Sequence, residues 1–158
     1  MREAFDVAVD LLTRREHSVR QLRYKLAKRG FDEQAIASAL LACQRLDLQS
    51  DVRFAEAACR SRIARGYGPL MLRQLLQYER VSSDIIEKIF DEIHQDIDWV
   101  AEASSVWVKK FGALNGASDL SDDAKAKAKQ KQGQFLRYRG FSDTTVRTMF
   151  EMFEAEHN

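Results

Sequence analysis

Residues that interrupt helices are scarce in this chain. Its 158 residues include one proline, Pro69, and seven glycines. Proline removes a backbone donor and glycine costs conformational entropy, so their scarcity favours long helices. No segment alternates apolar and polar side chains for long enough to predict a strand. We therefore expect an all-α protein.

Long apolar runs are also missing. No stretch approaches the roughly 20 apolar residues that a membrane-spanning helix needs. The first five residues, Met1–Phe5, carry charge and lack the apolar block of a signal peptide. We expect a cytoplasmic protein with no membrane partner. The two cysteines, Cys43 and Cys59, form no CxxC pair, and we interpret both as buried, reduced thiols.

Motifs of catalysis and of cofactor binding are absent from the sequence. It contains no GxxxxGK(S/T), GxGxxG, GxSxG or HExxH motif. The three histidines, His17, His94 and His157, lie far apart along the chain, and we interpret them as surface residues. Because no set of nucleophile, base and orienting group is visible, we predict no enzyme activity, no catalytic residue, no metal site and no cofactor.

What the chain does contain is a repeated pattern. The segment Leu26–Phe31 (LAKRGF) recurs 110 residues later as Leu136–Phe141 (LRYRGF). A diverged copy, displaced by 50 residues from the first, puts Arg80 at the position of Gly30. A unit of about 50 residues that is used three times is typical of a helical array, and such arrays offer an extended surface in place of one pocket.

We predict an elongated array of three tandem three-helix repeats. Ser18 is expected to cap a helix, with Gln21 in the capping-box position, and Gly30 to end that helix in the left-handed conformation. The repeats are predicted to span residues 1–50, 51–97 and 98–158, with an inserted loop near 112–121. Further caps are expected at Asp32, at Asp51, at Ser82 or Ser83, and at Asp122 or Asp123.

Charge is unevenly distributed, although the net charge is only +1. Residues 1–80 hold 15 Lys and Arg against 10 Asp and Glu, a sum of +5, and residues 81–158 hold 10 against 14, a sum of −4. Basic residues concentrate at 14–29, 60–73 and 125–139, in similar places of the repeats. Such a distribution favours an acidic polymer or an acidic protein surface as the partner.

The basic stretches supply the candidate partner-binding residues. Arginine can hold a carboxylate or a phosphate through two hydrogen bonds, and tyrosine beside arginine suits both protein hot spots and base stacking. Taken singly, each tyrosine near these stretches (Tyr24, Tyr67, Tyr78 and Tyr138) is interpreted as a partly buried packing residue. The predicted set is Arg14, Arg15, Arg20, Arg23, Lys28, Arg29, Arg62, Arg65, Tyr67, Arg73, Lys125, Lys129, Arg137 and Arg139. This pattern does not separate a nucleic acid from an acidic protein.

Taken in order, the motifs of the chain resemble those of the RecX family of regulatory proteins, which modulate the RecA recombinase. Gln21 departs from the family pattern, in which glutamate is common before the leucine, but glutamine also serves a capping box. The resemblance rests on Leu11, Leu12, Arg15, His17, Ser18, Leu22, Lys25, Leu26, Arg29, Gly30, Phe31, Asp51, Phe54, Ala55, Arg62, Gly66, Gly68, Pro69, Lys125, Lys127, Phe135, Leu136, Arg139, Gly140, Phe141 and Ser142.

The resemblance implies a curved array of three-helix units without enzymatic activity. Our own expectation is that the protein is a monomer. The resemblance implies binding in the groove of the RecA–DNA filament across neighbouring subunits. By that route the protein would inhibit the recombinase, ATPase and co-protease activities of RecA and so modulate DNA repair, recombination and the SOS response. It also implies weak contact with single- or double-stranded DNA. The alternative hypothesis is a stand-alone helical DNA-binding module.

Overall fold

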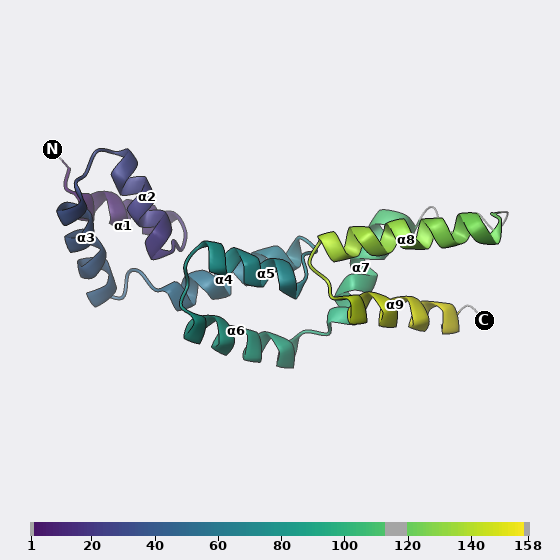
Figure 1. Cartoon of the computed structure of the whole chain (residues 1–158). Coiled ribbons are helices and arrows are strands. Elements are labelled where there is room, and N and C mark those ends of the chain that lie inside the picture. Colours follow the sequence, from purple (N-terminus) through teal and green to yellow (C-terminus); the bar gives the residue numbers. More distant parts are fainter. Residues whose placement is uncertain (1, 113–119, 157–158) are drawn as a thin grey trace. The chain divides into compact units, whose positions relative to one another are not determined.

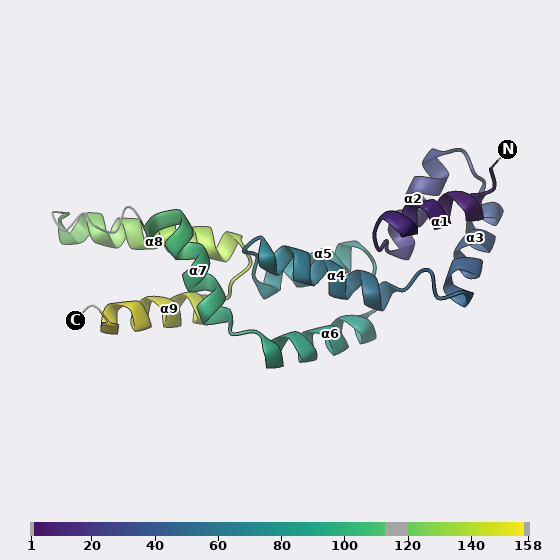
Figure 2. The same cartoon turned by 180° about the vertical axis from the view of Figure 1, so that it is seen from behind.

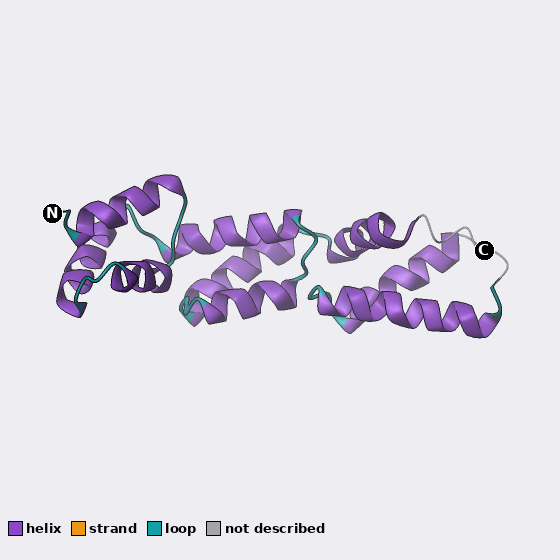
Figure 3. Cartoon of the chain, turned by 90° about the horizontal axis from the view of Figure 1, so that it is seen from above, coloured by secondary structure: helices purple, strands orange, loops and turns teal. Residues whose placement is uncertain are grey.

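The chain is built from helices. A computed structural model describes residues 2–112 and 120–156, which form nine helices and no strand (Figure 3), so the all-α prediction is confirmed. None of the described helices is long and apolar enough to cross a membrane. The helices are α1 (Ala4–Arg14), α2 (Val19–Lys28), α3 (Glu33–Arg45), α4 (Asp51–Ala64), α5 (Pro69–Tyr78), α6 (Ser83–Asp96), α7 (Trp99–Phe111), α8 (Asp122–Tyr138) and α9 (Asp143–Glu156).

The nine described helices can be taken as three consecutive sets of three. The limits of the three predicted repeats, 1–50, 51–97 and 98–158, stay a prediction. Most of the loop expected near 112–121 falls on residues 113–119, outside the described residues. The chain divides into two compact units, whose boundary passes through α4, α5 and α6. The first unit comprises Met1–Arg60 and Leu75–Asp91, and the second comprises Ser61–Gln74 and Glu92–Asn158.

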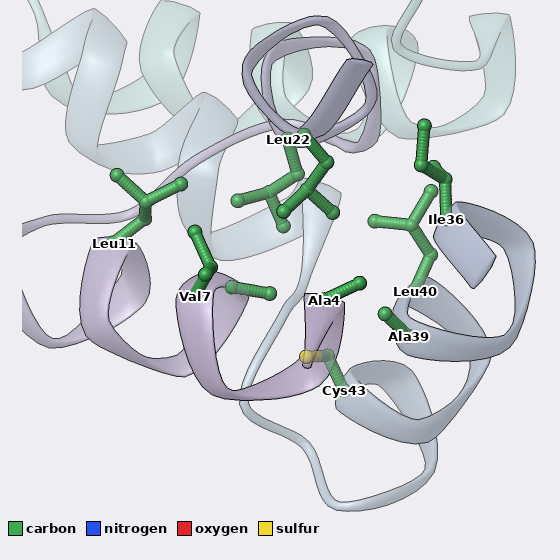
Figure 4. Close-up of a cluster of buried hydrophobic side chains, with 10 residues drawn as sticks. Ala4, Val7, Leu11, Leu22, Ile36, Ala39, Leu40 and Cys43 are labelled. Carbon is green, nitrogen blue, oxygen red and sulfur yellow. The ribbon is translucent and has the colours of Figure 1, made fainter. Parts of the chain in front are cut away.

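In the first unit, α1, α2 and α3 pack on one another around an aliphatic core (Figure 1). Leu22 and Leu26, one helical turn apart on α2, are both fully buried. Leu22 points from α2 toward the side chains that α1 and α3 contribute (Figure 4). Cys43 lies in this core and Cys59 is buried on α4, and both are free thiols, as predicted. Burial raises the pKa of Cys43 and raises that of Cys59 to about 11.

The second unit contains a bundle of α7, α8 and α9 (Figure 2) with an aromatic core. Trp107 is buried, and its ring meets Phe153 edge-on at 4.7 Å between centroids. The indole N–H of Trp107 donates to the Gln132 side-chain oxygen at 2.8 Å, so the one polar atom of that ring is satisfied. Leu136, fully buried on α8, joins the same core.

A recurring turn ends the middle helix of each set of three. Gly30, Arg80 and Gly140 all adopt the left-handed conformation, with φ of 93°, 57° and 103°. The next residue in each case, Phe31, Val81 or Phe141, donates its backbone N–H to the carbonyl five residues earlier, at 3.1–3.3 Å. The alignment of Arg80 with the two glycines is therefore confirmed. A left-handed residue with a side chain costs roughly 1–2 kcal/mol, which makes glycine the preferred residue.

The predicted capping residues lie at or next to the observed helix starts, but the capping residue itself was not always predicted correctly. Ser18 caps α2 as expected, because its hydroxyl accepts from the Gln21 backbone at 3.0 Å. The return bond expected from Gln21 is wrong, since that side chain donates to Glu79 and accepts from Arg15. Asp32 and Ser82 accept from the residues three positions later, as expected.

Two aspartate caps were predicted wrongly. Ser50 caps α4, accepting from the Arg53 backbone at 3.2 Å, while the Asp51 carboxylate accepts from the Val19 backbone at 3.1 Å. Ser121 caps α8, so Asp122 and Asp123 stand inside its first turn. In both places several residues able to cap are adjacent, and the backbone path decides which of them is used.

His17 was predicted to lie on the surface, and this is wrong because it is 1% exposed. Its Nδ1 lies 3.0 Å from the carbonyl oxygen of Arg15, and its Nε2 lies 3.0 Å from the ammonium group of Lys25. Both contacts are hydrogen bonds only if the ring is neutral with its proton on Nδ1. Burial, ahead of the positive charges of Arg15 and Lys25, lowers the pKa of His17 below its usual 6.5.

Beside His17, the start of α2 meets the end of α5 through buried side chains. The Ser18 hydroxyl donates to one carboxylate oxygen of Glu79 at 2.8 Å, and the Gln21 amide donates to the other at 3.2 Å. Glu79 is only 6% exposed, and each of its two carboxylate oxygens accepts one of these hydrogen bonds within the first unit. Losing such a buried acceptor would leave two donors unpaired, at a cost of about 1–3 kcal/mol each.

The recurring turn predicts different costs for two glycine substitutions. A methyl group on Gly140 would lie 2.6 Å from the Met71 backbone nitrogen and Cβ, whereas one on Gly30 would meet nothing within 4 Å. We expect Gly30→Ala to lower the free energy of unfolding by about 1–2 kcal/mol from conformational strain alone. Gly140→Ala should lower it by about 1–3 kcal/mol more, because the crowded backbone must shift. Urea unfolding followed by circular dichroism measures both, and equal losses would contradict the close approach.

The buried neutral His17 predicts a loss of stability in mild acid. The unfolded chain binds a proton at this residue below a pKa of about 6.5, while the folded chain resists it. The free energy of unfolding therefore falls as the pH drops through that value. We expect His17→Gln, which keeps polar atoms but cannot titrate, to show a shallower fall in urea midpoint over the same pH range. Identical slopes for the variant and the natural protein would contradict the assignment.

Candidate partner-binding site

The predicted partner-binding residues divide between the two units. Those of the first unit, on α1 and α2 or at their ends, are Arg14, Arg15, Arg20, Arg23, Lys28 and Arg29. Those of the second unit, on α4, α5 and α8 or at their ends, are Arg62, Arg65, Tyr67, Arg73, Lys125, Lys129, Arg137 and Arg139. Within each unit the structure gathers some of them into clusters and ties others to nearby carboxylates.

Three of the predicted arginines gather around Lys25 in the first unit. Burial, followed by the positive charges of Arg15, Arg14 and Arg29, lowers the pKa of Lys25. We call Arg14, Arg15, Lys25 and Arg29 the α1–α2 basic cluster. The three arginines are exposed. Like charges held together at a surface are unfavourable in the free protein, and an anionic partner would relieve that repulsion.

Cations and tyrosines alternate on the outer face of α2. The Arg20 guanidinium lies 4.2 Å from the centre of the Tyr78 ring, and the Lys28 ammonium lies 5.4 Å from that of Tyr24. Arg20, Tyr24 and Lys28 follow one another at four-residue spacing, so they share a face of the helix. We call Arg20, Tyr24 and Lys28, together with Tyr78 of α5, the tyrosine strip. Both cations lie within the distance at which a ring attracts a positive charge.

The tyrosines of the strip are more exposed than predicted. Tyr24 is 60% exposed and Tyr78 is 64% exposed, and Tyr138 on α8 is 82% exposed. The interpretation of these three as partly buried packing residues is wrong, whereas Tyr67 is half-buried as expected. Exposed aromatic rings beside cations are typical of binding surfaces, for proteins and for nucleic-acid bases alike.

Three other predicted residues already have carboxylate partners. Arg23 pairs with Glu33, Lys129 with Glu154, and Arg137 with Asp143. Such exposed pairs contribute little stability, about 0–1 kcal/mol, but they cancel much of the charge that a partner would feel. Arg73 is partly buried on α5, and Lys125 is exposed on α8. The structure therefore leaves these five outside the clusters.

In the second unit, predicted residues from α4 and α8 meet on Tyr67. The guanidinium carbons of Arg62 and Arg139 lie 5.6 and 4.8 Å from the centre of its ring. Arg139 also lies 5.2 Å from the centre of the Phe135 ring, and one of its N–H groups donates to the Arg65 carbonyl at 3.1 Å. The Arg139 fork is thus held in place before any partner arrives.

The backbone beside Arg139 is also fixed. The Gly68 N–H donates to the Arg139 carbonyl at 2.8 Å, and the Leu70 N–H donates to the Gly140 carbonyl at 2.9 Å. A methyl group on Gly68 would lie 2.6 Å from that backbone, so only glycine fits there. These bonds join the start of α5 to the end of α8 and bring Tyr67 next to Arg139.

A cleft of about 240 Å³ opens beside this cluster in the second unit. Its polar lining includes Arg65, Arg139, Lys109 and Lys110, with Glu102 as its carboxylate, and its apolar lining includes Ile63, Val106 and Phe135. Lys109, Lys110 and Glu102 were missing from the predicted set. The available signal was the adjacent lysine pair in the last turn of α7, which lies outside the basic stretches used for prediction.

The clusters suit the binding of anions. Among residues 2–112 and 120–156 there is no group of three or more His, Cys, Asp or Glu side chains that could hold a metal ion. Among the residues that the structure describes, the groups whose pKa is clearly shifted are His17, Lys25, Cys43, Arg53 and Cys59, and all five lie in the first unit, outside the cleft. The site of the second unit consists of positive charge held in place against aromatic rings, as Arg139 is against Tyr67 and Phe135.

Comparison of the chain with known proteins agrees with this description. The family model for the first three-helix domain of RecX matches residues 4–41, and that for the second three-helix domain of RecX matches residues 50–88. The fold is similar to that of the crystal structure of RecX from Lactobacillus salivarius, with a TM-score of 0.76 and 21% identity over 96% of this chain and 95% of that one.

Relatives named regulatory protein RecX are similar over most of their length. The protein from Legionella pneumophila (strain Corby) is 41% identical over 158 residues, covering 99% of each chain. That from Vibrio vulnificus (strain CMCP6) is 36% identical over 142 residues, covering 90% of this chain and 87% of the relative. Identity of this level over nearly whole chains shows common descent as well as a common fold. The chain therefore belongs to the RecX family of regulatory proteins.

Proposed function

We propose that this protein binds the RecA–DNA filament in its groove and inhibits the recombinase, ATPase and co-protease activities of RecA. Membership of a family of regulatory proteins supports the regulatory role. The observation that favours a large anionic partner is the α1–α2 basic cluster, in which burial, followed by the nearby positive charges of Arg15, Arg14 and Arg29, lowers the pKa of Lys25. An anionic surface would stabilise that arrangement, and a groove that contains DNA is anionic.

Occupation of the groove would act by exclusion. A protein that lies between neighbouring RecA subunits would oppose the subunit movements that ATP hydrolysis and filament growth require. The aromatic rings under Arg20 and Arg139 hold both arginines in place, so less side-chain entropy is lost when a partner binds. Exposed tyrosines and arginines are also the residues that dominate binding energy at protein interfaces.

The α1–α2 basic cluster predicts which charge reversals weaken the inhibition of RecA. Arg14→Glu with Arg29→Glu removes two exposed cations for which the described residues provide no ion pair. We expect the concentration that half-inhibits DNA-dependent ATP hydrolysis by RecA to rise at least about tenfold. The fold should not weaken, because the substitutions relieve repulsion around Lys25.

The matched control is Arg45→Glu with Lys88→Glu. These residues are also exposed cations of the first unit, on α3 and α6, and the control makes the same change in net charge. It should inhibit as the natural protein does, to within about twofold. Undiminished inhibition by the cluster variant, with its circular dichroism intact, would reject the cluster as the contact surface.

A second candidate function is direct binding of single-stranded DNA, which the tyrosine strip favours. Tyr24 and Tyr78 are exposed and flanked by Lys28 and Arg20, an arrangement that suits stacking of bases with cations near the phosphates. The net charge of +1 argues against a general affinity for DNA, since dedicated DNA-binding proteins are often strongly basic.

This second function predicts that labelled single-stranded DNA binds the protein without RecA, and more weakly as salt is raised. Tyr24→Ala with Tyr78→Ala should then reduce the affinity about tenfold or more. Tyr138→Ala, which removes an even more exposed ring outside the strip, serves as the control and should change little. Binding that is absent without RecA, or insensitive to salt, would exclude the stand-alone function.

A further inference from the structure

We propose that the cleft of the second unit receives an acidic side chain of a protein partner together with an apolar side chain next to it in that partner. The cleft lies between the end of α4, α7 and α8. The proposal concerns the chemistry of the ligand and holds whether or not the partner is RecA. It rests on the size of the cleft, its charge, and the state of its aromatic ring.

The size of the cleft suits part of a macromolecule. Its volume is about 240 Å³, whereas sites for free small molecules are typically about 300–1,000 Å³. A carboxylate side chain with one neighbouring apolar side chain is the kind of fragment that a shallow cleft of this size receives. The apolar lining from Ile63, Val106 and Phe135 provides a surface on which an apolar side chain can be buried.

The charge of the cleft is positive and unpaired. Four cations line it, Arg65, Lys109, Lys110 and Arg139, against the single carboxylate of Glu102. None of the four forms an ion pair with another described residue of the chain. Such clustering in a partly enclosed site is unfavourable until an anion enters, and the fixed Arg139 fork is suited to grip a carboxylate.

The state of Phe135 disfavours a nucleic-acid ligand. The Lys110 ammonium and the Arg139 guanidinium carbon lie 5.5 and 5.2 Å from the centre of its ring, and Phe111 meets it edge-on at 5.4 Å between centroids. A base would have to displace a cation in order to stack on this ring. The Glu102 carboxylate would also repel the backbone phosphates on either side of a bound base, whereas a peptide backbone has no such charges.

The test uses the full-length protein and two labelled probes. One is a short, end-capped peptide that carries a single glutamate next to a leucine and no other charge, with a matched peptide that has glutamine in place of the glutamate. The other is a single-stranded oligothymidylate. Binding is measured by fluorescence anisotropy. We expect the acidic peptide to bind at least about tenfold more tightly than its glutamine counterpart, because the cations of the cleft attract the glutamate carboxylate.

Variants locate the site. Lys109→Glu with Lys110→Glu should weaken binding of the acidic peptide at least about tenfold. The control Lys127→Glu with Lys131→Glu reverses two exposed lysines on α8, in the same unit but outside the cleft lining, and should leave the affinity unchanged. Glu102→Gln removes the carboxylate that repels the ligand and should tighten binding about two- to fivefold. A variant that misfolds would bind more weakly, so tighter binding cannot result from misfolding.

Three results would overturn the proposal. The first is equal affinity for the acidic and glutamine peptides. The second is an equal loss in the cleft variant and in the α8 control variant. The third is tighter binding of the oligonucleotide than of the acidic peptide, with the oligonucleotide affinity lost in the cleft variant, because the cleft would then be a nucleic-acid site. Inhibition of RecA ATP hydrolysis by each variant is a separate measurement, so this proposal and the proposed function fail independently.

Discussion

The organisation of this protein depends on one backbone constraint, the left-handed turn that ends the middle helix of each set of three. Each turn stops a helix and folds the next side chain back onto the core, since its backbone N–H bonds to a carbonyl five residues earlier. The next helix then starts at once on a side-chain cap. Only a residue that tolerates positive φ can hold such a turn at low cost, and glycine does so in two of the three.

The residue before each turn shows how one position can serve different purposes. Arg29 is exposed and belongs to the α1–α2 basic cluster. Glu79 is buried and accepts hydrogen bonds from the start of α2. Arg139 lies against two aromatic rings beside the cleft. The turn places all three at a helix end, and the neighbouring residues decide whether the side chain becomes a binding group or a structural bond.

The two units present positive charge in different ways. The first offers exposed arginines crowded around Lys25, together with tyrosines that remain largely open to solvent. The second fixes Arg139 between Tyr67 and Phe135 beside a partly apolar cleft. Crowded exposed charge suits an extended anionic surface, whereas fixed charge beside an apolar wall suits one acidic side chain at a time. We therefore expect the two units to contribute different contacts to a common partner.

Periodicity and spacing alone determined the helical class, the repeated turn, the buried leucines and the buried cysteines, because each follows from local backbone preferences and from one apolar face per helix. Local signals could not choose between adjacent caps such as Ser50 and Asp51, since both suit the role and the path of the chain selects one. The sequence also marked arginines and lysines as one class. Only packing between helices decided which of these side chains pair with carboxylates and which gather around Lys25 and Tyr67. The same packing buries His17 and places Lys109 and Lys110 in the lining of a cleft. Contacts between residues far apart in the chain decide those outcomes, and no pattern along a single helix encodes them.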